Sequence, residues 1–306
     1  MPRKSITKLS LLFFCIFCAV VWTFASLRPH YAAAPALDAW VLDVGQGESV
    51  LIHEPSGKKI LYDGGPDDSV LTQLGDVVPA WDRSIDLVIL SHNHSDHLRG
   101  LITVLQRYTV KEIWVSGALY ATADFRAFQK EISQHQVPVQ TRFFKAADCV
   151  AGTPCPPTTV FGQLTLQVYH PLTDMTGSLP GDQHDATVSV KVSFHGESLF
   201  LIGDLNETHE KQMLETCPPP DCTLSATVLQ TPHHGSATGL SPPFLAAVAP
   251  QVAVIPVGLK NSYGHPAPST IAKLAAAHIP TYRTDTQGRI HLVLYGDHFT
   301  VETEKP

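Results

Sequence analysis

Short apolar runs bounded by glycine, proline or aspartate recur along the chain and predict buried β-strands. Polar turns separate neighbouring runs, as at residues 54–57. The strands that this pattern predicts are residues 40–44, 49–53, 59–62, 85–90, 113–115, 164–169, 187–194, 198–202, 227–230, 252–257, 289–295 and 299–302.

Other segments carry apolar residues at the three- and four-residue spacing of a helix face. Leu98, Leu101, Ile102 and Leu105 show this spacing clearly. The predicted helices are residues 98–107, 124–136, 206–215, 242–248 and 269–278. Strands mixed with separate helices predict an α/β fold in which two sheets pack together and helices cover their outer faces.

Composition is that of a globular chain and gives no general affinity for nucleic acid. Of the 306 residues, 44% are apolar and 16% are charged, and the formal net charge is −7. No strongly basic surface follows from such a balance. A nucleic-acid substrate is not excluded, because bound metal ions add local positive charge.

The N-terminal segment has the pattern of an export signal. Arg3, Lys4 and Lys8 precede the apolar run 9–25, which contains no charged residue. We expect an uncleaved membrane anchor rather than a cleaved signal, with the remainder exported in either case. Cleavage would make the protein secreted or periplasmic. Residues 1–37 are therefore interpreted as a signal segment plus a short linker, and residues 38–306 as one catalytic domain.

Four cysteines form two pairs that are close in sequence. Cys149 and Cys155 flank one turn-rich stretch, and Cys217 and Cys222 flank another. In an oxidising compartment these pairs are expected to form local disulfides. Free thiols are the main alternative, and a zinc ribbon would need tighter spacing.

A cluster of metal-ligand residues follows the strand predicted at residues 85–90. His92, His94, Asp96 and His97 lie within six residues, and imidazole and carboxylate are good zinc ligands. His92 and His94 are predicted to face one metal ion, while Asp96 and His97 serve a second beside it.

Further ligand types follow later strands. Asp204 follows the strand predicted at residues 198–202 after one glycine, where a carboxylate can bridge two metal ions. At the end of the strand 227–230, one residue of the His233–His234 pair is expected to be a ligand and the other to face substrate. His184 is preferred over His170 as the remaining ligand of the first metal.

These residues predict a site with two divalent metal ions, which we expect to be zinc, with manganese or iron as alternatives. Asp96 is expected to orient the attacking water. His233 or His265 would stabilise developing charge or protonate the leaving group.

Several motifs resemble the metallo-β-lactamase superfamily, and more closely the hydrolase-like C-terminal domain of ComEC-type DNA-uptake proteins. The histidine cluster indicates the superfamily, and the elements 44–47 and 263–266 narrow the likeness. The other segments that share it are residues 42–49, 62–66, 203–204, 233–236 and 282–285.

The resemblance implies an αββα four-layer sandwich with two metal ions at one edge between the sheets. It also implies metal-ligand roles for His92, His94, Asp96, His97, Asp204 and His234. Two departures from the DNA-uptake branch are histidine at position 94, often aspartate there, and His184, where asparagine is usual. The multi-helix channel of those proteins is not among the predicted elements, so we do not expect this chain itself to conduct DNA across a membrane.

These features predict an extracytoplasmic metal-dependent hydrolase that acts on a phosphodiester, either DNA or a phosphorylated envelope polymer. A lactonase or β-lactamase is the alternative among enzymes, since a fold does not fix function. A metal-binding component of a DNA-uptake or envelope machine, without enzymatic activity, is the third possibility. No helix for binding a protein partner stands out in the sequence.

Overall fold

The computed structural model describes residues 35–149, 155–217 and 222–306. Most of the predicted signal segment, including the apolar run 9–25, lies outside these residues. Among the described helices, none is long and apolar enough to span a membrane.

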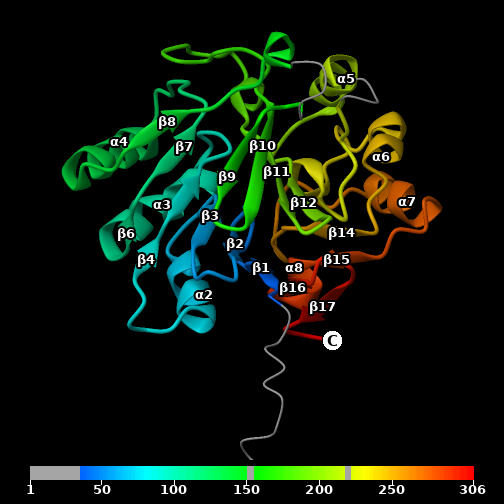
Figure 1. Cartoon of the computed structure of the whole chain (residues 1–306), viewed down its shortest axis with the longest axis horizontal. Coiled ribbons are helices and arrows are strands. Elements are labelled where there is room, and N and C mark those ends of the chain that lie inside the picture. Colours follow the sequence, from blue (N-terminus) through cyan, green and yellow to red (C-terminus); the bar gives the residue numbers. More distant parts are fainter. Residues whose placement is uncertain (1–34, 150–154, 218–221) are drawn as a thin grey trace, which may run out of the picture. The chain divides into compact units, whose positions relative to one another are not determined.

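The first sheet has eight strands, antiparallel in one half and parallel in the other (Figure 1). Their order is β17 (Phe299–Thr303), β16 (Ile290–Leu294), β1 (Leu37–Val41), β2 (Val50–His53), β3 (Lys59–Tyr62), β5 (Leu87–Ile89), β7 (Ile113–Val115) and β8 (Val139–Thr141). The strands from β3 to β8 are parallel. β8 is the last strand in this order and therefore lies at an edge of the sheet.

The second sheet has seven strands and a similar division, parallel from β15 to β12 and antiparallel from β12 to β9. Their order is β15 (Thr281–Arg283), β14 (Val252–Ile255), β13 (Val228–Gln230), β12 (Glu197–Leu201), β11 (Ser189–Phe194), β10 (Leu164–His170) and β9 (Thr158–Phe161). The parallel strands bring the chain segments that follow β5, β12 and β13 to one edge of the molecule.

Three apolar cores define four layers. The central core joins the inner faces of both sheets, as Ile89 and Leu201 illustrate. A second core lies between the first sheet and helices α2 (Ser69–Val77), α3 (Ser95–Arg107) and α4 (Ala123–His135). A third lies between the second sheet and helices α5 (Glu207–Thr216), α6 (Pro242–Val248) and α7 (Pro268–Ala276). The expected αββα sandwich is thereby confirmed.

Short elements complete the chain. β4 (Ser84–Ile85) and β6 (Thr109–Val110) form a separate two-stranded sheet. The remaining helices are α8 (Thr284–Gln287) and the 3-10 turns η1 (Ala146–Asp148), η2 (Gln183–Ala186) and η3 (Pro232–Gly235). Both expected disulfides, Cys149–Cys155 and Cys217–Cys222, are present.

Two sequence-based expectations need correction. The strand predicted at residues 85–90 is divided at Asp86, whose backbone N–H donates to the carbonyl oxygen of Lys59. The helix predicted at residues 98–107 begins at Ser95, so that Asp96 and His97 lie in its first turn and not in a loop. On a helix, only side chains three or four residues apart lie on the same face. Asp96 and His97 are successive residues, so their side chains point in different directions.

Candidate metal centre

The polar residues singled out in the sequence meet at the edge where parallel strands end. His92 and His94 follow β5, and His94 is the N-cap of α3. Asp204 follows β12, His234 follows β13 within η3, and His184 lies in η2, just before β11. Four segments that are distant in sequence thus contribute to one site.

Asp63 orients the His97 ring through the ring nitrogen that faces away from the site. Nδ1 of His97 lies 2.8 Å from Oδ2 of Asp63. Ser91 donates to both oxygens of the same carboxylate, at 2.7 Å from its backbone nitrogen and 2.6 Å from its hydroxyl. Because Asp63 accepts from Nδ1, the other ring nitrogen, Nε2, faces Asp204, whose Oδ2 is 3.3 Å away. A carboxylate behind a histidine is the usual support of a metal ligand.

Two further histidines, His234 and His184, are oriented in the same way. Nδ1 of His234 donates to the carbonyl oxygen of Pro256 at 2.9 Å. Nδ1 of His184 lies 2.7 Å from Oδ1 of Asp182. In both residues the supported Nδ1 leaves Nε2 directed at the centre of the site.

Two groups of donors share one carboxylate. One metal-ligand atom from each of His92, His94 and His184 lies within 4.8 Å of the others, and the same holds for Asp96, His97, Asp204 and His234. Oδ2 of Asp204 is also 3.9 Å from Nε2 of His92 and 4.0 Å from Nε2 of His184. Asp204 therefore lies between the two groups, where a bridging ligand would stand.

Divalent cations fit this arrangement. Within the described residues, four buried atoms that point into the site have no hydrogen-bond partner, namely Nε2 of His97, His184 and His234 and Oδ1 of Asp204. A buried polar atom without a partner costs about 1–3 kcal/mol. Metal ions held by the two donor groups would satisfy all four atoms, and the donor types are those that zinc prefers.

Electrostatics separates the two groups. Burial, reinforced by His97, holds the pKa of His92 well below its ordinary value, and burial also lowers that of His94. Burial acts against protonation of His97 and His234 as well, but Asp204 and Asp96 outweigh it and raise both pKa values. His92 and His94 thus offer neutral imidazoles, while the carboxylates of Asp96 and Asp204 in the second group supply the negative charge that attracts a cation.

Backbone strain marks the same site. His233 and His234 both have positive φ, 50° and 53°, and Asp63 has φ 58°. Residues other than glycine adopt this conformation rarely, and such strain is concentrated at functional sites. His234 joins the second donor group, whereas His233 lies at the pocket wall, where its Nε2 is 3.6 Å from Oδ2 of Asp204 and forms a further possible donor group with His184 and Asp204.

The site opens into a polar pocket of about 380 Å³. His233 and His265 lie on its wall with ring centres 5.6 Å apart. His265 belongs to neither donor group. His170 also lies apart: it is buried, and its Nδ1 donates to the carbonyl oxygen of Thr187 at 2.6 Å. Of the two candidates for the remaining ligand, the structure places His184 in the site.

Sequence reasoning gave no role to several residues that shape the site. Asp63 lies within the motif 62–66, which was noted only for its family resemblance. Glu48 is fully buried beside Asp63 and His97. Gln46, Tyr120 and Tyr263 line the pocket. The role of Asp63 could have been suspected because its carboxylate comes directly after a buried strand. The positions of Glu48, Gln46, Tyr120 and Tyr263 depend on how loops pack together, which the sequence pattern does not indicate.

Comparison with known proteins places this geometry in a family. Residues 42–258 match the family described as the metallo-beta-lactamase superfamily. Recombination protein 2 of Haemophilus influenzae is 26% identical over 94% of this chain and 33% of its own length. Competence protein ComA of Neisseria gonorrhoeae is 26% identical over 89% of this chain and 34% of its own length. The chain spans about a third of the length of these relatives.

Among solved structures, CmlA, a diiron beta-hydroxylase from Streptomyces venezuelae, is 15% identical, with a TM-score of 0.49 over 85% of this chain and 54% of that one. The competence relatives confirm the resemblance to ComEC-type proteins that the motifs indicated.

The match to the family covers well over half of this chain. The chain therefore belongs to the metallo-beta-lactamase superfamily.

Proposed function

We propose that the protein is an extracytoplasmic dinuclear metal-dependent hydrolase that cleaves a phosphodiester, either DNA or a phosphorylated envelope polymer. The observation that carries the proposal is the position of Asp204 between two donor groups at the floor of an open pocket. A structural metal site encloses its ion in protein ligands, whereas this one faces solvent on the pocket side.

The ligands divide as the donor groups do. His92, His94 and His184 would hold one cation, Asp96, His97 and His234 would hold the other, and Asp204 lies within reach of both. Bound divalent cations of this kind make water a nucleophile near neutral pH and stabilise negative charge on the attacked group. Zinc suits the donors best, with manganese or iron as alternatives.

Three side chains act on substrate or water from the pocket. The side chain of Asp96 is 31% exposed there, so its carboxylate can orient a water molecule while it also serves as a ligand. Burial lowers the pKa of His233 to about 4, which keeps this residue neutral at neutral pH. A neutral imidazole donates a hydrogen bond to developing charge, whereas His265, less buried, is better suited to protonating the leaving group.

The substrate and the compartment are supported by independent observations. The names of the relatives refer to recombination and competence, processes that handle DNA, which supports a phosphodiester substrate. Two disulfides support an oxidising compartment outside the cytoplasm. The basic and apolar N-terminal pattern supports export and membrane attachment.

One preparation of the chain tests this proposal. Metal content is measured together with hydrolysis of bis-p-nitrophenyl phosphate, with and without chelator, for the wild type and Asp96→Asn. We expect about two metal ions per chain and hydrolysis that is lost in both controls. Metal without phosphodiester hydrolysis, followed by cleavage of nitrocefin, would assign the chain to the β-lactamase type instead. Metal without any hydrolysis would favour a non-enzymatic component.

A further inference from the structure

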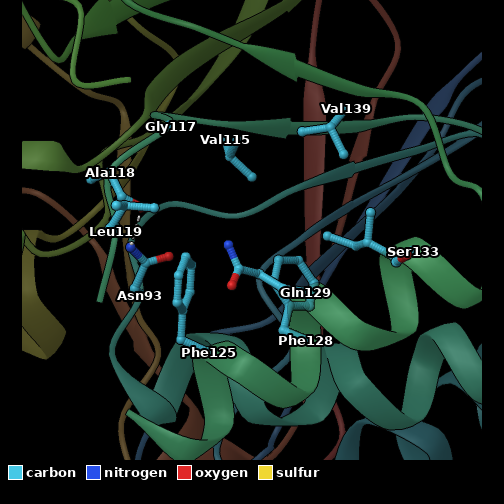
Figure 2. Close-up of a pocket in the computed structure, with 11 residues that line it drawn as sticks. Asn93, Val115, Gly117, Ala118, Leu119, Phe125, Phe128, Gln129, Ser133 and Val139 are labelled. Carbon is cyan, nitrogen blue, oxygen red and sulfur yellow. Dashed lines mark hydrogen bonds between the residues drawn. The ribbon is translucent and has the colours of Figure 1, made fainter. Parts of the chain in front are cut away.

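A second pocket is lined by Asn93 and Leu119, whose chain neighbours His94 and Tyr120 line the metal pocket. It has a volume of about 280 Å³ and lies between α4, the end of β7 and the edge strand β8 (Figure 2). Its apolar walls are formed by Val115, Leu119, Phe125, Phe128, Ile132 and Val139. This volume is close to the lower end of small-molecule pockets, about 300–1,000 Å³, and suits one ring system.

Asn93 provides a fixed polar group on the pocket wall. Its amide nitrogen donates to the carbonyl oxygen of Ala118 and to Oε1 of Gln183, both at 3.0 Å. Gln183 in turn donates to the carbonyl oxygen of Leu119 at 3.2 Å. Because backbone carbonyls accept only, these bonds determine the orientation of both amides.

The oxygen of Asn93 is left as an acceptor for a ligand. Both amide hydrogens of this residue are used within the protein, and the side chain is 4% exposed. Figure 2 shows the oxygen turned away from Ala118 and towards Phe125, on the pocket side. An acceptor that faces a cavity favours a ligand with an N–H or O–H donor.

The mouth of the pocket suits a flat, mainly apolar ligand. Val139 is 45% exposed and Leu119 38% exposed, so the walls stay apolar up to the surface. Gln129 and Ser133 of α4 add polar groups beside them. Together with the ring of Phe125, these features resemble a site for a nucleobase, which combines an apolar face with hydrogen-bonding edges.

We propose that this pocket binds a nucleobase, with an N–H of the base donating to Oδ1 of Asn93. This inference rests on the proposed function and gives its substrate class, nucleic acid. Asn93 lies between His92 and His94, and Leu119 is followed by Tyr120, which lines the metal pocket. The same two chain segments therefore line both pockets, and a strand whose phosphodiester occupies one can place a neighbouring base in the other.

Binding of free nucleosides tests the proposal without any phosphate group. Saturation-transfer NMR is recorded for the chain in chelator, with adenosine and with N6,N6-dimethyladenosine, which lacks N–H donors on its base. We expect saturable binding of adenosine, weakened about tenfold in the dimethyl compound by loss of the hydrogen bond to Oδ1 of Asn93. Equal binding of the two, or no saturable binding of adenosine, would overturn the proposal.

Matched variants locate the binding site. Val139→Trp fills the mouth and should weaken adenosine binding about tenfold or more. Gln140→Trp adds the same ring to the other face of the same edge strand and should bind as the wild type does. Unaltered binding by Val139→Trp would place adenosine elsewhere and overturn the proposal. Hydrolysis of bis-p-nitrophenyl phosphate by the wild type is measured in parallel, because its failure contradicts the proposed function alone.

Discussion

The backbone N–H of Gly64 donates to the carbonyl oxygen of His97 at 2.7 Å, which joins the loop after β3 to the first turn of α3. One turn further along the helix, the backbone N–H of Gly100 donates to the carbonyl oxygen of Gly65 at 3.0 Å. The position of a predicted metal ligand is thus determined by backbone contact between a loop and a helix, and glycine allows that contact.

Gly100→Ala is therefore expected to disturb the site. A Cβ at this position would collide with the carbonyl oxygen of Gly64, and such overpacking costs about 1–3 kcal/mol. We expect a lower free energy of unfolding in urea together with weaker metal binding, because α3 carries Asp96 and His97. Gly75→Ala in α2 is the control: it has open space, and it should stabilise the protein by roughly 0.5–1 kcal/mol. Unchanged metal affinity in Gly100→Ala would contradict this reasoning.

Asp63→Asn is expected to lower metal affinity by about 10–100-fold, as loss of a carboxylate behind a metal-binding histidine usually does. Asparagine tolerates the positive φ of this position, but its NH₂ group cannot accept from Nδ1 of His97. The tautomer of His97 with its proton on Nε2 is then favoured, because Nδ1 can accept from the asparagine NH₂ group. A protonated Nε2 cannot bind a metal ion. Metal affinity is measured by competition with a coloured chelator. Asp68→Asn, an exposed change in the neighbouring turn, should bind metal as the wild type does.

The sequence allowed prediction of the four layers and of a cluster of ligand types after buried strands, because both depend on local patterns. The start of α3 was missed because residues 95–97 are polar and show no apolar periodicity. β8 was missed because all three of its residues are exposed, so no alternation appears. The role of Asp63 could not be assigned, since it depends on a partner 34 residues away. The choice between His170 and His184 likewise required tertiary structure.

Glu48→Gln should stabilise the metal-free protein at alkaline pH. Burial, reinforced by Asp63, raises the pKa of Glu48 well above 4.5, and neither carboxylate oxygen has a hydrogen-bond partner within the described residues. An acid with a raised pKa in the folded state binds more protons there, so the wild type loses stability as pH rises above about 4.5. Glutamine stays neutral and avoids this loss.

Urea unfolding of both proteins in chelator, at about pH 5 and pH 8, measures the effect. We expect the advantage of Glu48→Gln to be larger at the higher pH. Glu215→Gln, an exposed change near the end of α5, should show no such trend. A wild type that is the more stable protein at pH 8 would show that Glu48 is ionised and compensated in the fold.

His170→Gln should make the protein less sensitive to acid. Burial lowers the pKa of His170 to about 3, although its bond to Thr187 opposes the shift. Between this value and the unfolded pKa, about 6.5, the unfolded chain binds more protons, so stability is fully present above about pH 6.5 and is lost as pH falls. The loss from this one residue reaches about 2 kcal/mol by pH 5, since each unit of pKa difference corresponds to about 1.4 kcal/mol.

Glutamine can donate to the same carbonyl oxygen of Thr187 without titrating, so this part of the acid sensitivity should disappear. The free energy of unfolding is measured in urea from about pH 7 to pH 5, in chelator, for the wild type and the variant. His135→Gln, at a surface position of α4, controls for the removal of one imidazole. Parallel pH curves for the wild type and His170→Gln would mean that His170 accepts a proton in the folded state, which requires water to reach the interior beside β10.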